Sequence, residues 1–118
     1  MPSKGDHLAK AINNRRFADG VNVTSPTGIG WAMTALFYSA LHYVEAYNAQ
    51  YNMHCRKHEE LSNDIGRNPV LVPIHDDYRD LSSFSWNARY QPVNYNAKDL
   101  EEAKACQEAV AKLIKGHI

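Results

Sequence analysis

The sequence has no excess charge of either sign, few cysteines and no long hydrophobic run, and each absence excludes a class of protein. Lys and Arg number 13 and Asp and Glu number 13, so the formal net charge is zero. The basic footprint of a dedicated nucleic-acid binder is therefore missing, and any contact with RNA or DNA must come from a local patch. A surface without net charge also lacks the repulsion that keeps copies apart, which permits self-association.

Two cysteines, Cys55 and Cys106, are too few for a disulfide framework and form no C-x-x-C pattern. The segment 1–7 lacks the apolar core of a signal peptide, and no run reaches the roughly 18 apolar residues of a membrane span. From these features we expect a cytoplasmic protein with reduced thiols and no membrane contact. A length of 118 residues fits one domain, 1–118, that folds without a metal or a disulfide.

Helical spacing of apolar residues runs through most of the chain. Ser25 followed by Pro26 gives an N-cap and a proline at the first helical position, and Asn96 with Asp99 forms a variant of the capping box. We expect helices at 4–17, 26–49, 54–67, 76–90 and 96–115, with 70–74 as an extended connector. The sequence therefore predicts an all-α fold, an up-down helical bundle of four longer helices plus one short helix.

The segment 26–49 is expected to be the centre of the bundle. Between Trp31 and Tyr47 it is apolar nearly all round, which is typical of a helix that is buried on most faces. Small residues along it let neighbouring helices approach closely: Ala32, Ala35, Ser39, Ala40 and Ala46. The last helix has one apolar face, made of Leu100, Ala103, Cys106 or Gln107, Val110, Leu113 and Ile114. We expect this face to pack on the central helix around Leu36, Leu41 and Val44.

Histidines occur at spacings that metal sites use, but no complete ligand set is present. His54 and His58 lie at i and i+4 on one helix face, yet the sequence fixes no third ligand. His42 and Glu45 are neighbours at i and i+3, but di-iron bundles use the order Glu-x-x-His on two helices. We therefore predict no metal site and no cofactor. As a polar residue in the most apolar helix, His42 is predicted to have a hydrogen-bonding partner on another helix.

Cations and aromatic residues gather at the end of the fourth predicted helix. Arg89 and Tyr90 lie there, with Arg79 and Trp86 nearby. Arginine and aromatic rings together can hold a phosphate and stack a base. The alternative, which we favour, is a packing cluster in which Arg89 pairs with an acidic residue.

The remaining reactive residue types have structural explanations. Asp76 and Asp77, after His75, suit the N-terminus of a helix, which favours negative charge. Cys106 is expected in the core. The neighbours of Cys55 can lower its pKa, but no base is defined beside it, so the sequence does not support nucleophilic catalysis.

Taken together, these segments resemble the HEPN family of small helical domains. The run Trp31-Ala-Met-Thr-Ala-Leu-Phe-Tyr-Ser-Ala-Leu-His-Tyr-Val-Glu-Ala-Tyr is similar to the long central helix of one bacterial branch. Later segments of that branch resemble His58-Glu-Glu, Tyr78-x-x-Leu81 and Ala88-Arg89-Tyr90, so the resemblance covers about 8–114. It implies a homodimer with a nucleotide or RNA role of bacterial defence or toxin–antitoxin type, and a cognate antitoxin-like protein as partner.

Many HEPN proteins are metal-independent RNases in which a dimer brings together two copies of an Arg-x(4–6)-His motif. No arginine of this chain is followed by histidine at that spacing: Arg67 to His75 is too long, and Arg56 to His58 is too short. Leu61 also stands where the branch has an arginine, three residues after the position of His58. We therefore expect no RNA cleavage by the usual site of the family.

The predicted function is a non-catalytic nucleotide- or RNA-associated module. The candidate polar and ligand-binding residues are His42, Glu45, His58, Arg89 and Tyr90. Two alternatives stay open: a metal-independent RNase with a rearranged site of His42, His58 and Arg89, and a structural domain that binds another protein. Two copies of Arg89 and His58 beside one dimer groove would favour the RNase, whereas dispersed, fully paired side chains would favour the interaction domain.

Overall fold

The computed structural model describes residues 2–53 and 58–118, without the side chains of His58 and Glu59. This part of the chain is helical and contains no strand, which confirms the all-α prediction. In chain order the elements are α1 (Lys4–Gly20), α2 (Pro26–Ala49), α3 (His58–Arg67), the 3-10 helix η1 (Val72–Ile74), α4 (His75–Tyr90) and α5 (Ala97–Lys115). Among the residues described, no helix is both long and apolar enough to cross a membrane.

The predicted helix starts are present as hydrogen-bonded caps. The Ser25 hydroxyl accepts from the backbone N–H of Gly28 at 3.2 Å, and Pro26 occupies the first turn of α2. Asn96 and Asp99 exchange two hydrogen bonds of 2.9 Å each at the start of α5. Each cap satisfies N–H groups that the first turn leaves without a helical partner, so the sequence itself determines where both helices begin.

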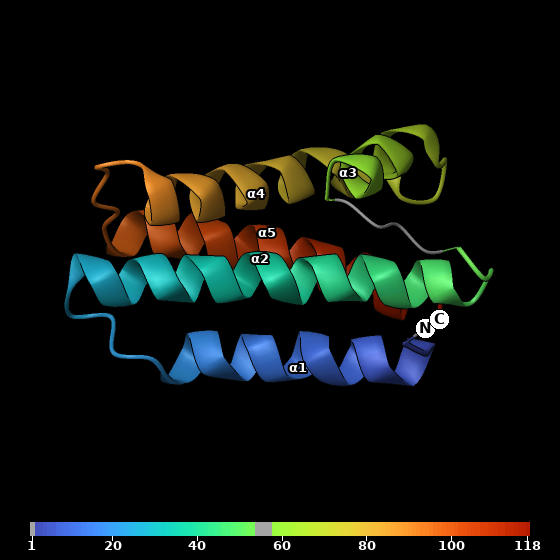
Figure 1. Cartoon of the computed structure of the whole chain (residues 1–118), viewed down its shortest axis with the longest axis horizontal. Helices are drawn as coiled ribbons and strands as arrows, with labels where there is room; N and C mark the ends of the chain where they lie inside the picture. The colour runs from blue at the N-terminus through green and yellow to red at the C-terminus, as the bar shows by residue number, and fades with distance from the viewer. Residues whose placement is uncertain (1, 54–57) are drawn as a thin grey trace.

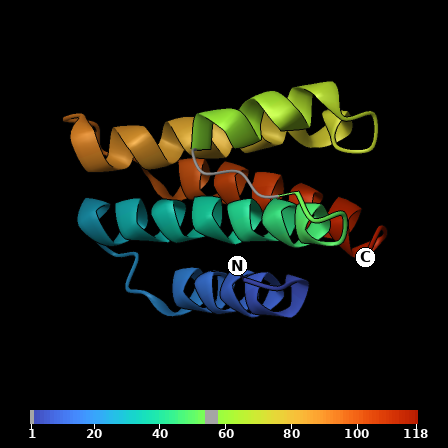
Figure 2. The same ribbon diagram turned by 45° about the vertical axis from the view of Figure 1, so that its right-hand side comes forward.

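α2 runs through the middle of the molecule (Figure 1). α1 packs along one side of α2, whereas α4 and α5 pack along the other, and this order persists when the molecule is turned (Figure 2). The short helix α3 contacts α4 and η1. The four longer helices and one short helix of the prediction are therefore present, with α2 as the helix that the others share.

One hydrophobic core joins the helices. The predicted stripe of α5 is buried at Leu100, Ala103, Val110 and Ile114, and the α2 residues expected opposite it are buried as well: Leu36, Leu41 and Val44. Two details differ from the expectation. Gln107 rather than Cys106 is fully buried, and Leu113 lies at the edge of the core. Successive helical residues point about 100° apart, so a choice between two neighbours depends on the exact orientation of the helix.

A series of hydrogen bonds between polar side chains, which we call the polar thread, crosses this core and links α1, α2 and α5. The Ser39 hydroxyl donates to the backbone carbonyl of Ala11 at 2.8 Å, and the Gln107 amide donates to the Ser39 hydroxyl at 3.0 Å. Arg15 on α1 donates in turn to the side-chain oxygen of Gln107. Because buried polar groups need partners, this thread fixes where α1 lies along α2.

Three segments differ from the boundaries predicted for them. α1 continues to Gly20, and the described part of α3 begins at His58, since 54–57 lie outside the described residues. The connector at 70–74 contains η1 instead of being extended throughout. Residues three apart share a face of a 3-10 helix, so this turn lets Leu71 and Ile74 both face the core, where both are buried.

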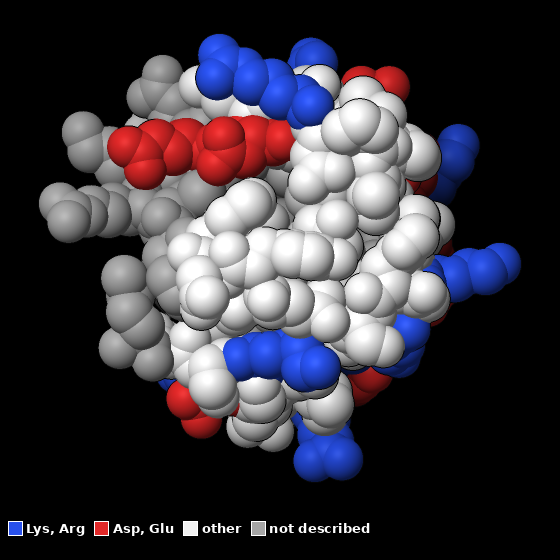
Figure 3. Space-filling model, turned by 90° about the vertical axis from the view of Figure 1, so that its right-hand side faces the viewer, with Lys and Arg blue, Asp and Glu red and all other residues white. Residues whose placement is uncertain are grey.

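Charged side chains are scattered over one end of the bundle. The end of the bundle that carries both termini has a mainly uncharged centre, with separate Lys or Arg and Asp or Glu side chains around it (Figure 3). On the described part of this face there is no continuous basic patch.

The burial of α5 predicts which apolar truncations are costly. Ile114 is fully buried, so Ile114→Ala should lower the free energy of unfolding by about 2–5 kcal/mol, as removal of a buried isoleucine does. Leu113→Ala, at the edge of the core, should cost less than half as much. Urea unfolding followed by circular dichroism measures both, and equal losses would contradict the orientation of α5.

The turn before α2 predicts an intolerance of side chains at Gly28. A Cβ added there would lie 1.7 Å from the Asn22 carbonyl oxygen, so Gly28→Ala forces the backbone apart and should cost about 1–3 kcal/mol or more. Gly20 is the matched control, because a Cβ added there meets nothing within 4 Å. Gly20→Ala should be neutral or stabilising in the same thermal melt, since alanine is the better helix former.

Candidate functional site

Two of the predicted site residues, His42 and Glu45 on α2, contact His7 on α1. His7 Nδ1 lies 3.0 Å from His42 Nδ1 and 3.1 Å from Glu45 Oε2, and His42 Nδ1 lies 3.6 Å from that same oxygen. The planes of the two imidazole rings are inclined by 29°, and their centroids lie 5.3 Å apart. His42 thus has a hydrogen-bonding partner on another helix, which confirms that prediction. We call His7, His42 and Glu45 the histidine–glutamate cluster.

This cluster is sheltered from water but still reachable. The His7 side chain is 8% exposed, and the side chains of His42 and Glu45 are about one-fifth exposed. Burial raises the pKa of Glu45 above its usual value, because desolvation disfavours the carboxylate. A cation or a proton held between the imidazoles and the carboxylate would offset that penalty.

His7 was not among the residues that the sequence pattern indicated. Most of α1 is polar, and its apolar positions give little hint of which side faces the bundle. Its buried residues, His7, Ala11 and Ala18, nevertheless lie four and seven positions apart, on one side of a helix. That stripe of a histidine with small alanines was the signal that could have placed His7 against α2.

Arg89 lies at the C-terminal end of α4, against α2. Its Nε donates to the Ser85 carbonyl at 3.2 Å, and one terminal nitrogen donates to the Tyr38 hydroxyl at 3.5 Å. The guanidinium carbon lies 5.0 Å from the centre of the Tyr90 ring and 5.9 Å from that of Tyr38. Among the residues described, no carboxylate pairs with Arg89, so the acidic partner that we favoured from the sequence is not found there. Tyr38, 51 positions away in the chain, takes its place.

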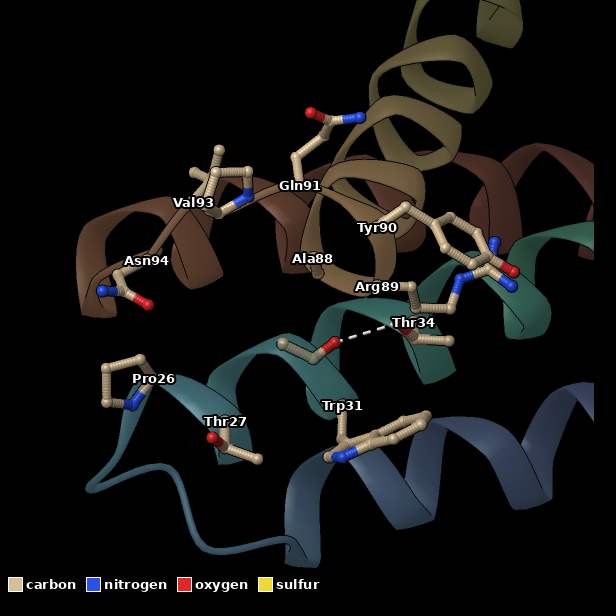
Figure 4. A pocket seen from close by; sticks show the side chains of 12 residues that line it. Pro26, Thr27, Trp31, Thr34, Ala88, Arg89, Tyr90, Gln91, Val93 and Asn94 are labelled. Atoms are coloured by element: carbon tan, nitrogen blue, oxygen red, sulfur yellow. Dashed lines mark hydrogen bonds between the residues drawn. The ribbon is translucent and has the colours of Figure 1, made fainter.

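A pocket of about 540 Å³ opens beside Arg89, between the first turns of α2 and the end of α4 (Figure 4). Arg89 and Tyr90 extend from α4, and Trp31 extends from α2. Trp31 is 54% exposed and Tyr90 is 59% exposed, although Trp31 belongs to the helix expected to be buried. The pocket is lined by Pro26, Thr27, Gly30, Trp31, Thr34, Ala88, Arg89, Tyr90, Gln91, Pro92, Val93 and Asn94, a set without a carboxylate.

The structure does not bring all the candidate residues together. Arg89 hydrogen-bonds Tyr38, which precedes His42 by four residues on α2, but in the described part of the chain no hydrogen bond joins Arg89 to His42. Arg79 faces Asp76 at 4.0 Å and is not among the residues that line the pocket. The side chain of His58 lies outside the described residues, as do His54 and Cys55 entirely.

Cys106 lies half-buried at the contact of α5 with α4. Burial, with the negative charges of Asp77 and Asp80 nearby, raises the pKa of its thiol from 9.0 to about 12. The thiol also hydrogen-bonds the Asp77 carboxylate. A thiol held protonated in this way is a poor nucleophile, so this cysteine is a packing residue.

No family model, curated protein or solved structure matches the chain. What the protein does must therefore be argued from the chemistry of its own residues.

The surroundings of Cys106 predict slow alkylation. In a Cys55→Ser background at pH 9, iodoacetamide should modify folded Cys106 at least about tenfold more slowly than in urea, because only the thiolate reacts. Asp77→Asn, which removes the nearest negative charge, should speed the reaction of the folded protein. Folding favours the protonated thiol, so this contribution to stability is complete below pH 9 and is lost as the pH rises toward 12. Equal rates in the folded and unfolded protein would contradict the burial of the thiol.

Proposed function

We propose that the protein binds the phosphate and base of a nucleotide or of a single-stranded RNA segment in the pocket beside Arg89. The observation that carries this proposal is an arginine held in place by neutral groups. Its partners are a backbone carbonyl and a tyrosine hydroxyl, and no carboxylate neutralises it among the described residues. The guanidinium thus lies beside a cavity without an acidic partner among the described residues, which is the arrangement that a phosphate needs.

The orientation of the guanidinium supports the same conclusion. The hydrogen bonds to Ser85 and Tyr38 each use one of its five N–H groups, and the remaining N–H groups are available to an incoming oxygen. A side chain that is already oriented loses less conformational entropy when it binds. Neighbouring hydroxyl and amide groups of Thr27, Gln91 and Asn94 offer further donors and acceptors for a sugar or a base edge.

Exposed aromatic rings around the pocket supply stacking surfaces. More than half of Trp31 and of Tyr90 is accessible to solvent, and Trp86 packs against Tyr90 with ring centroids 4.6 Å apart. Large exposed aromatic side chains that gather at one place mark a binding surface more often than scattered ones do. Base stacking on such rings contributes about 1–3 kcal/mol per base and tolerates any sequence.

The charge of the whole chain limits the kind of ligand. With a net charge of zero and one cation in the pocket, long-range attraction to a polyanion is weak. The ligand that fits is a short one, in which one phosphate and one or two bases are bound. We expect a shallow dependence of affinity on salt, as for roughly one phosphate contact.

The same geometry favours binding over cleavage. A metal-independent RNase needs an acid or base and a cation beside one phosphate. Here Arg89 reaches Tyr38, whereas His42 is engaged by His7 on α1. The rearranged RNase, the homodimer and the antitoxin-like partner that the HEPN resemblance implies remain predictions.

Substitution of Arg89 should separate specific binding from general attraction. We expect a fluorescein-labelled oligouridine of about ten nucleotides to bind the protein, and Arg89→Gln to weaken it roughly tenfold or more in fluorescence anisotropy. Arg79→Gln is the matched control, since it removes the same charge from the same helix at a side chain that faces Asp76. Equal weakening by both variants, or no binding by the parent protein, would contradict the proposal.

The two tryptophans of the chain, Trp31 and Trp86, report on the pocket directly. Uridine monophosphate should quench the intrinsic fluorescence, and Trp31→Phe should abolish most of the change, because Trp31 lines the pocket. A change that survives Trp31→Phe and disappears with Trp86→Phe would place the ligand elsewhere.

The same pocket is expected to bind RNA without cleaving it. Gel analysis of the labelled oligouridine after incubation with the protein should show it intact. Cleavage by the parent that is lost in both Arg89→Gln and His42→Gln would favour the rearranged RNase.

A further inference from the structure

The histidine–glutamate cluster brings three metal-ligand atoms to one point. The atoms are His7 Nδ1, His42 Nδ1 and Glu45 Oε2, and they lie within 4.8 Å of one another. They belong to side chains of two helices whose relative position is fixed by the polar thread a turn away. Neither the fold nor the proposed pocket accounts for two imidazoles and a carboxylate that face each other in this way.

The distances between the three atoms match those between ligand atoms around a tetrahedral zinc ion. The pairwise separations of 3.0, 3.1 and 3.6 Å define a triangle with a circumradius of about 1.9 Å. Three ligands of a tetrahedral zinc ion, each at about 2.0–2.1 Å, lie on a circle of the same radius. An ion could therefore sit slightly to one side of this triangle and reach all three atoms without any movement of the helices.

The donor set is also chemically suited to zinc. Two histidines with one glutamate form the protein ligands of several catalytic zinc sites, where water takes the fourth position. Without a metal, the two Nδ1 atoms and Oε2 must share the available protons, and the three lone pairs compete for them. A divalent cation interacts favourably with all three at once, and it compensates the desolvation of the Glu45 carboxylate.

We propose that His7, His42 and Glu45 form a binding site for a divalent transition metal ion, with zinc as the best match. The exposed parts of His42 and Glu45 give the ion a path from solvent. This site is independent of the Arg89 pocket, whose lining includes none of the three residues. It differs from the prediction of no metal site, which compared His42 and Glu45 only with the Glu-x-x-His pairs of di-iron bundles and did not include His7.

Bound zinc would hold α1 against α2. α1 packs mainly on α2, and its buried apolar residues are two alanines, Ala11 and Ala18. A metal bound only by the folded protein stabilises it in proportion to the logarithm of the metal concentration above the dissociation constant. Zinc should therefore raise the melting temperature, and a chelator should reverse the rise.

The test measures zinc binding by the full chain and its variants. After removal of metal by a chelator, zinc is titrated in competition with a chromophoric chelator, and the cobalt complex is examined for the absorption bands of a four-coordinate ion. We expect one ion per chain. His42→Gln and Glu45→Gln should each weaken binding at least about tenfold to a hundredfold, since each removes a ligand. His117→Gln, at an exposed histidine beyond α5, is the matched control and should bind as the parent does.

The variants also show whether zinc lies elsewhere. Gln keeps the hydrogen-bonding capacity of the partly exposed Glu45 side chain, and circular dichroism confirms that each variant is helical. Unchanged affinity in both His42→Gln and Glu45→Gln, or no binding by the parent, would overturn the proposal. Binding that is lost in His58→Gln but kept in His42→Gln would overturn it as well, because the ion would then belong to another histidine pair.

Discussion

The structure depends on the need to cover α2. Sixteen of its 24 residues are buried, on nearly every side of the helix, so no single neighbour can shield it from water. α1 covers one side, and α4 with α5 covers the other. Small residues make this close approach possible: at Gly30 the backbone of α2 lies so near Ala88 that an added Cβ would meet the alanine Cβ at 3.4 Å. The other helices take their places from this one.

Both proposed sites follow from the part of α2 that remains uncovered. Trp31, Tyr38, His42 and Glu45 lie at spacings of seven, four and three residues, which places them on one face. Each retains some exposure, in contrast to the buried residues between them. At one end of this face, Trp31 lines the pocket together with Arg89, and Tyr38 accepts a hydrogen bond from Arg89. At the other end, His42 and Glu45 meet His7 of α1. One packing arrangement thus creates two sites with different chemistry.

The sequence predicted those features that depend on local rules. The helices, the caps at Ser25 and Asn96, and the buried face of α5 follow from hydrogen-bonding needs and spacing within a few residues. The partner of Arg89 could not be found in this way, since Tyr38 lies 51 positions away and acidic residues are as common as basic ones. The sequence indicated that His42 needed a partner, but His7 could be identified only once the register of α1 on α2 was known. Long-range partners depend on tertiary packing, which no local pattern specifies.

That register is fixed by the hydrogen bond from Ser39 to the carbonyl of Ala11. The two helices run in opposite directions, so four residues back along α1 correspond in space to three or four residues forward along α2. His7 lies four residues before Ala11, a rise of about 6 Å along α1, and His42 lies three residues after Ser39, a rise of about 4.5 Å along α2. The two histidines therefore lie at nearly the same distance from the hydrogen bond between Ser39 and Ala11. A slip of one helical turn, about 5.4 Å, would leave Ser39 without its acceptor and would carry His7 past His42. The buried hydroxyl therefore specifies more than a contact in the core, because the same bond that aligns α1 brings Nδ1 of His7 to within 3.0 Å of Nδ1 of His42.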